Sequence, residues 1–178
     1  MATNDDINTI KLQFFSYRNG IVASRLRNSG DSHKYIMGCM LPDITDISRN
    51  YKQSIELAHA LWSEKEHREC RLAATMLYPV EKLNFDTAIK WCYEVENHEI
   101  ADVLCLRLLC RCSFASELWN KLLQSEDDLM QYIGLRILAN LTTKGEPLSH
   151  KTVGILSQYS LNAKPSLAKF AKGIMVED

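Results

Sequence analysis

The chain has 178 residues, of which 46% are apolar and 24% charged, and its formal net charge is −1. This composition is ordinary for a globular domain with a real core, and the near-neutral charge argues against a broadly basic nucleic-acid binder. No apolar run approaches the roughly 20 residues that cross a bilayer, and the polar start at Met1–Asp6 is unlike a signal peptide, so we expect a cytoplasmic protein without a membrane partner.

The N-terminal part of the chain is expected to hold short helices. Ile7–Tyr17 has the apolar spacing of an amphipathic helix, and Gly20–Arg27 has that of a short second helix. Asn28–His33 is a polar linker. Pro42 stands where a proline suits the first turn of a further helix.

From there to the C-terminus, apolar stripes at helical spacing follow one another, and no segment alternates as a strand does. The second helix of each pair is expected to begin at a cap at Ser63, Asn97, Ser125 and Asn162, and the intervening helices at Asn84, Ser113 and Ser149. The first four caps lie 34, 28 and 37 residues apart. Such a period, filled by two helices and a tight turn, is typical of an α-solenoid.

We therefore predict an all-α fold, a right-handed α-solenoid of HEAT-like helical pairs (an ARM-type superhelix). It forms a single domain over residues 1–178, with a terminal capping repeat at 144–178. An ordinary helical bundle with coincidental cap spacing is the alternative. In the solenoid, the second helices beginning near Glu64, His98 and Glu126 would line the concave face, where such folds bind partners.

Asp102 is the candidate functional residue that the sequence singles out. It lies about one turn inside the helix that opens at Asn97, among apolar neighbours from Ile100 to Cys110, and it would project either onto the concave face or into the core. A buried carboxylate is costly unless it is paired or has a chemical task. The structural alternative is a carboxylate that interacts with the helix dipole and is neutralised by Arg71 or Arg107.

The six cysteines are expected to be reduced thiols. Cys105 and Cys110 lie in apolar helical sequence, and Cys110–Cys112 lacks the two-residue gap of a zinc knuckle. No second pair stands at ligand spacing. We therefore expect neither a metal site nor another cofactor.

Positive charge is concentrated near the C-terminus. The segment from Leu129 to Gly173 has a net charge of +5, which leaves −6 for the rest of the chain. Its basic residues are Arg136, Lys144, Lys151, Lys164, Lys169 and Lys172. A solvated charged face is one explanation, and a surface that contacts phosphates is the other.

Three blocks of sequence resemble those of a known family. Tyr35–Asp43 resembles the Tyr-Gly-Val-x-x-Pro segment of the DNA alkylation repair glycosylases, the AlkD-like family. Leu61-Trp62 followed by Glu69–Ala74 resembles their Leu-Trp and Glu-x-Arg-x-x-Ala block, and Trp91 followed by Glu96–Asp102 resembles their Trp and Asp-Ser-Trp-Asp-x-x-Asp block. The best match covers residues 35–141.

The resemblance implies an array of HEAT-like repeats that acts on duplex DNA. Members of the family remove cationic N3- or N7-alkylated purines, and a carboxylate stabilises the oxocarbenium-like sugar as the base leaves. By position, Asp102 matches the catalytic aspartate of the family.

Two family residues are not matched at the expected positions. His98 stands where the family has an active-site tryptophan, and Gln131 or Tyr132 stands where its arginine is expected. Arg136 lies one turn further on and would reach the same groove only with a shifted register. The candidate DNA-contacting residues are thus His98, Tyr132, Arg136, Lys144, Lys164, Lys169 and Lys172.

Three functions fit these observations. The first is a DNA alkylation repair-like protein that binds duplex DNA on its concave face without cleaving it. The second is an active alkylpurine DNA glycosylase with Asp102 as its catalytic carboxylate. The third is a protein-interaction scaffold, because HEAT-like folds also bind proteins and a fold by itself does not fix a function.

Overall fold

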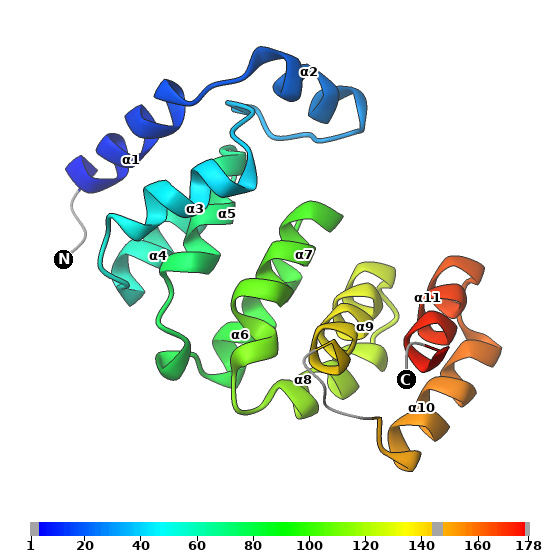
Figure 1. The fold of residues 1–178 in the computed structure, drawn as a ribbon. Coiled ribbons are helices and arrows are strands. Elements are labelled where there is room, and N and C mark those ends of the chain that lie inside the picture. Colours follow the sequence, from blue (N-terminus) through cyan, green and yellow to red (C-terminus); the bar gives the residue numbers. More distant parts are fainter. Residues whose placement is uncertain (1–3, 144–147, 177–178) are drawn as a thin grey trace. The chain divides into compact units, whose positions relative to one another are not determined.

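The computed structural model describes residues 4–143 and 148–176, and the regular secondary structure of these residues is helical (Figure 1). Within the same residues, none of the helices is both long enough and apolar enough to cross a membrane. The chain divides after Leu83 into two compact units, each with its own set of packed helices. The all-α prediction is confirmed, whereas the prediction of a single domain over the whole chain stays a prediction.

Unit 1 is built around α5. Its helices are α1 (Asn4–Ser16), α2 (Gly20–Asn28), α3 (Leu41–Arg49), α4 (Ile55–Trp62) and α5 (Arg68–Leu77), followed by the 3-10 turn η1 (Val80–Lys82). Nine of the ten residues of α5 are buried, because α3 and α4 pack against it. Helix α1 packs against α3 and α4 through Ile10 and Phe14. The predicted helices near 7–17 and 20–27 are confirmed, as is Pro42 in the first turn of α3.

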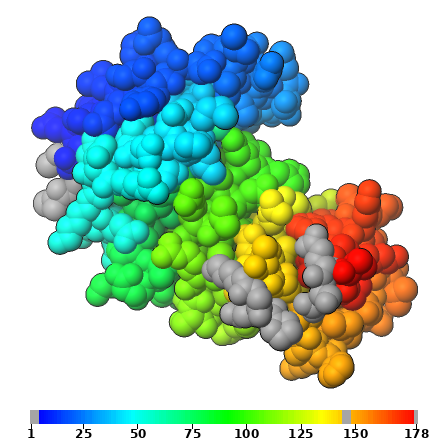
Figure 2. Space-filling view, viewed as in Figure 1, coloured from blue at the N-terminus to red at the C-terminus, as the bar shows by residue number. Residues whose placement is uncertain are grey.

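Gly38 is the point at which α2 is attached to the rest of unit 1. Its φ is +78°, and a Cβ at this position would lie 2.2 Å from the carbonyl oxygen of Asn19 and 2.7 Å from the backbone nitrogen of Ala23. Only glycine fits such a conformation and such a close approach. Helix α2 has no buried side chain and lies on the surface of unit 1 with α1, in the blue part of Figure 2.

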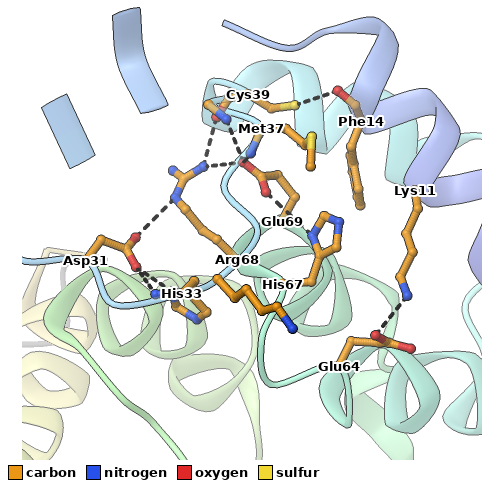
Figure 3. Close-up of polar contacts among 12 residues, drawn as sticks. Lys11, Phe14, Asp31, His33, Met37, Cys39, Glu64, His67, Arg68 and Glu69 are labelled. Carbon is orange, nitrogen blue, oxygen red and sulfur yellow. Dashed lines mark hydrogen bonds and ion pairs between the residues drawn. The ribbon is translucent and has the colours of Figure 1, made fainter. Parts of the chain in front are cut away.

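A network of buried charges joins the segment before α3 to the start of α5 (Figure 3). Glu69, which is fully buried, accepts hydrogen bonds from the backbone nitrogens of Met37 and Gly38 at 3.1 and 3.0 Å and from Arg68 at 2.9 Å. Arg68 also donates to the carbonyl of Cys39 at 3.2 Å. This carboxylate therefore holds in place the loop that carries Gly38.

Unit 2 is built around α9 and contains three helical pairs. Its elements are α6 (Phe85–Tyr93), α7 (His98–Arg107), the 3-10 turn η2 (Leu109–Arg111), α8 (Ala115–Leu123), α9 (Asp128–Thr142), α10 (His150–Asn162) and α11 (Pro165–Val176). Helix α9 packs against α7, α8 and α11. Gly134 allows α8 to approach closely, since a Cβ there would lie 2.9 Å from the carbonyl oxygen of Trp119.

Three of the predicted caps are confirmed. The side chains of Asn84, Asn97 and Ser149 accept hydrogen bonds from backbone nitrogens at the starts of α6, α7 and α10.

The other cap predictions are wrong. Ser63 ends α4, and α5 begins five residues later, at Arg68. The side chain of Asp127, not that of Ser125, caps α9, and Phe114 rather than Ser113 precedes α8. Asn162 is the last residue of α10 and does not cap α11, which begins at Pro165. In the first three cases an adjacent turn delays the helix, which local sequence preference does not reveal.

Candidate nucleic-acid interface

The candidate site lies on the second helices of the pairs in unit 2. Asn97 caps α7, so His98 is its first residue and Asp102 follows one turn later. Tyr132 and Arg136 are four residues apart on α9 and therefore lie on one face of that helix. Because α9 packs against both α7 and α11, side chains from three helices meet at this face.

Asp102 is held by two residues of α9. The hydroxyl of Tyr132 donates to Asp102 Oδ1 at 2.6 Å, and Arg136 Nε lies 2.8 Å from the same oxygen. The Asp102 side chain is 34% exposed and that of Arg136 is 36% exposed. Asp102 therefore does not lie in the core, and it is paired with Arg136.

Arg136 reaches Asp102 although the sequence placed it one turn too far along. Tyr132 and Arg136 contact the same carboxylate oxygen, so two successive turns of α9 face α7 at this point. The shifted register of α9, which the sequence analysis required for Arg136 to reach the groove, is the register in the structure. A carboxylate and an arginine therefore lie side by side at the surface of unit 2.

Tyr132 acts as a hydrogen-bond donor in this cluster. Burial, together with the adjacent Asp102 carboxylate, raises the pKa of Tyr132 far above its ordinary value. The phenol therefore stays protonated at neutral pH and donates a hydrogen bond to the Asp102 carboxylate.

Aromatic rings extend the cluster along the same three helices. The rings of His98 and Tyr132 meet edge to face with their centroids 4.5 Å apart, and the rings of Tyr132 and Phe170 lie 5.6 Å apart. Phe170 is not among the candidate residues from the sequence, but it is half-buried beside Tyr132. Its position next to Lys169 in a basic segment was the signal in the sequence that could have identified it.

An open pocket of about 400 Å³ continues from Arg136 along α9 and α11. Among the described residues, its polar lining consists of the side chains of Arg136, Asn140, Thr143, Ser166 and Lys169, and none of these is a carboxylate. The side-chain nitrogen of Asn140 is buried and has no hydrogen-bond partner within the described chain. A pocket that offers donors and positive charge suits an anion.

The remaining predicted lysines are placed less favourably. Lys164 forms an ion pair with Asp128, so its charge is already compensated. Lys172 is exposed on α11, and Lys144 lies outside the described residues. The structure therefore brings together His98, Asp102, Tyr132, Arg136, Lys169 and Phe170, and we call this set the Asp102 face.

The cysteines have the character of core residues. All six are free and buried, and burial raises the pKa of Cys39 and of Cys92 to about 12. Protonated thiols are poor nucleophiles and poor metal ligands. Among the residues that the structure describes, no cluster of three or more histidine, cysteine or acidic side chains could hold a metal ion.

Replacing Tyr132 with phenylalanine is expected to lower the free energy of unfolding by about 1 kcal/mol. The change removes one hydrogen bond to a charged group and keeps the ring contacts, and the half-exposed position limits the loss. Urea denaturation measures the difference. Tyr159→Phe, which removes a hydrogen bond to the neutral amide of Gln131, is the matched control and should cost less. Equal losses in the two variants would argue against a charge-assisted bond at Asp102.

Comparison with known proteins places this geometry in context. The model of the family described as DNA alkylation repair enzyme matches residues 10–172, a wider range than the predicted 35–141. One similar solved structure belongs to a group described as a new family of proteins related to the HEAT-like repeat DNA glycosylases with affinity for branched DNA structures. The two chains are 16% identical, the TM-score is 0.78, and the match covers 94% of this chain and 72% of the other. The search of curated proteins gave no significant match. The predicted HEAT-like fold is confirmed.

Proposed function

We propose that this chain, which belongs to the DNA alkylation repair enzyme family, binds duplex DNA through the Asp102 face of unit 2. The observation that carries the proposal is the pocket beside Arg136, where the described lining residues supply hydrogen-bond donors and two cations and include no carboxylate. DNA phosphates are the anions that such a surface would meet in a repair protein. The affinity for branched DNA that is described for the structural relative supports the same class of ligand.

Arg136 and Lys169 would supply the phosphate contacts. Arg136 contacts Asp102 through Nε, and its guanidinium has further N–H groups that match phosphate oxygens. Lys169 is exposed on α11 and lines the same pocket. Contacts of this kind position a protein on DNA without reading its sequence.

The aromatic residues of the Asp102 face would contact the sugar. His98 is exposed at the start of α7, and its ring abuts Tyr132, which abuts Phe170. Deoxyribose has an apolar side that packs on such rings, although histidine offers less apolar area than the tryptophan it replaces.

Binding of a blunt DNA duplex at increasing salt concentration tests this function. The logarithm of the affinity should fall linearly with the logarithm of the salt concentration, with a slope steeper than about −2, because at least two phosphate contacts release counterions. An affinity that is independent of salt, or no binding at low salt, would contradict the proposal and favour a protein-interaction scaffold.

Excision of N3- or N7-alkylated purines is the second candidate function. The observation that favours it is the exposure of Asp102, whose two partners both contact Oδ1. A carboxylate at the surface of a DNA-binding face could stabilise an oxocarbenium-like sugar. Against it, the positive charge of Arg136 already compensates the carboxylate, and His98 replaces an aromatic wall.

Base release from methylated duplex DNA decides between the two functions. If Asp102 is catalytic, the parent protein releases base above background, and Asp102→Asn abolishes the release while duplex binding is kept. If the parent binds duplex without releasing base, binding alone is the function of the Asp102 face.

A further inference from the structure

The surface formed by α1 and α2 carries exposed rings and arginines that the core of unit 1 does not use. Phe15 is 51% exposed, Tyr17 is 52% exposed and Ile21 is 70% exposed. The Arg18 guanidinium lies over the Phe15 ring, 4.2 Å from its centroid. We call Phe15, Tyr17, Arg18, Ile21 and Arg25 the α1–α2 surface.

These side chains face outward because of how the two helices are attached. On α1, Ile10 and Phe14 are buried, which turns Phe15 to the outside. On α2, Ala23 packs on Gly38, where a Cβ would lie 3.2 Å from that of Ala23. Ile21 and Arg25 are four residues apart and lie on the helix face opposite Ala23.

The charge of this surface identifies the kind of partner. From Tyr17 to Gly30 the chain has three arginines and no acidic residue. Arg27 donates to the carbonyls of His33 and Lys34, and Arg18 donates to the carbonyl of Phe15. All three arginines are nevertheless exposed. Exposed cations without compensating carboxylates along this stretch favour a polyanion.

The rings distinguish between forms of nucleic acid. A paired duplex hides the faces of its bases, so exposed rings gain little from it. Unpaired bases offer a π-face to an aromatic ring or to a guanidinium, and this stacking tolerates any sequence. Phe15, with Arg18 over its ring, and Tyr17 have the chemistry of such a stacking platform.

We propose that the α1–α2 surface binds single-stranded DNA through these rings and arginines. This assigns unit 1 a contact that is separate from the Asp102 face and goes beyond the function proposed for unit 2.

Binding of a single-stranded oligonucleotide of about eight nucleotides, compared with a blunt duplex, tests the proposal. A Phe15→Ala/Tyr17→Ala variant should bind the single strand about tenfold more weakly than the parent does, and it should keep its affinity for the blunt duplex. Tyr93→Ala, which removes an exposed ring in unit 2, should leave the single-strand affinity unchanged.

Unchanged thermal unfolding of the variant would establish that its fold is intact, which both exposed positions lead us to expect. Failure of the parent to bind the single strand would overturn the inference, as would single-strand binding that survives the double substitution. In either case the α1–α2 surface would belong to another class of partner, such as an acidic protein. Failure of the parent to bind the blunt duplex would instead contradict the function proposed for unit 2, and single-strand binding that the double substitution abolishes would still support the α1–α2 surface.

Discussion

Replacing Glu69 with alanine is expected to lower the free energy of unfolding of unit 1 by about 3 kcal/mol or more. Glu69 is fully buried, and it accepts two backbone hydrogen bonds from the loop before α3 and one from Arg68. Its removal takes a carboxylate partner away from the buried Arg68 and leaves the backbone nitrogens of Met37 and Gly38 without their acceptor. Denaturant unfolding followed by circular dichroism measures the loss.

Two further variants separate charge from hydrogen bonding at this position. Glu69→Gln keeps an oxygen that can accept from Met37 and Gly38 but gives up the ionic contact with Arg68, so its loss should be intermediate. Glu66→Ala removes an exposed carboxylate whose partner is the exposed Lys34 and should leave stability essentially unchanged. A Glu69→Ala variant as stable as the parent would contradict the view that this carboxylate holds the loop.

Substitutions of Asp102 and Arg136 are expected to change duplex affinity in opposite directions. Arg136→Gln removes a phosphate contact and should weaken binding about tenfold, the effect of roughly 1.4 kcal/mol. Asp102→Asn removes a negative charge beside that contact and releases Arg136 from its ion pair, so binding should become about threefold tighter. Fluorescence anisotropy with a labelled duplex at low salt measures both.

Lys121→Gln provides the matched control for charge, because Lys121 is exposed on α8, outside the Asp102 face. It should change the affinity less than Arg136→Gln does. Weaker binding by Asp102→Asn would mean that the carboxylate supports DNA binding by orienting Arg136, and would overturn the expected sign.

The position of Asp102 on its helix could be predicted from sequence, whereas its surroundings could not. The Asn97 cap fixes where α7 begins, and a cap is a local interaction between a side chain and the next few backbone nitrogens. The exposure of Asp102 depends instead on which face of α7 is covered. Ile100, Val103 and Leu104 are buried, while Leu106, one turn beyond Asp102, is 48% exposed.

The partner of Asp102 was missed for a related reason. The side chain that meets Asp102 depends on the register of α9 against α7, and that register follows from packing between distant residues, including the close approach at Gly134. The number of free positive charges that the basic C-terminal segment offers to phosphates was overestimated for the same reason. Lys164 counts as a free charge in the sequence, but in the fold it lies against Asp128.

The helical-pair architecture was predictable because it follows from periodic patterns that survive errors at single positions. Four predicted caps are wrong, yet the helical pairs and the family are correct. Glu69 illustrates the limit of such patterns. Its place in a family-like block was visible, but its bonds to Met37 and Gly38 join residues more than thirty positions apart.

The salt dependence of duplex binding by an Arg136→Gln/Lys169→Gln variant, compared with the parent, tests the central claim most directly. If the Asp102 face contacts DNA phosphates, the slope of log affinity against log salt should become shallower by about 2 in the variant, because each lost phosphate contact removes about 0.9 from the slope. An unchanged slope in a folded variant would mean that duplex DNA, if bound, is bound elsewhere on the protein.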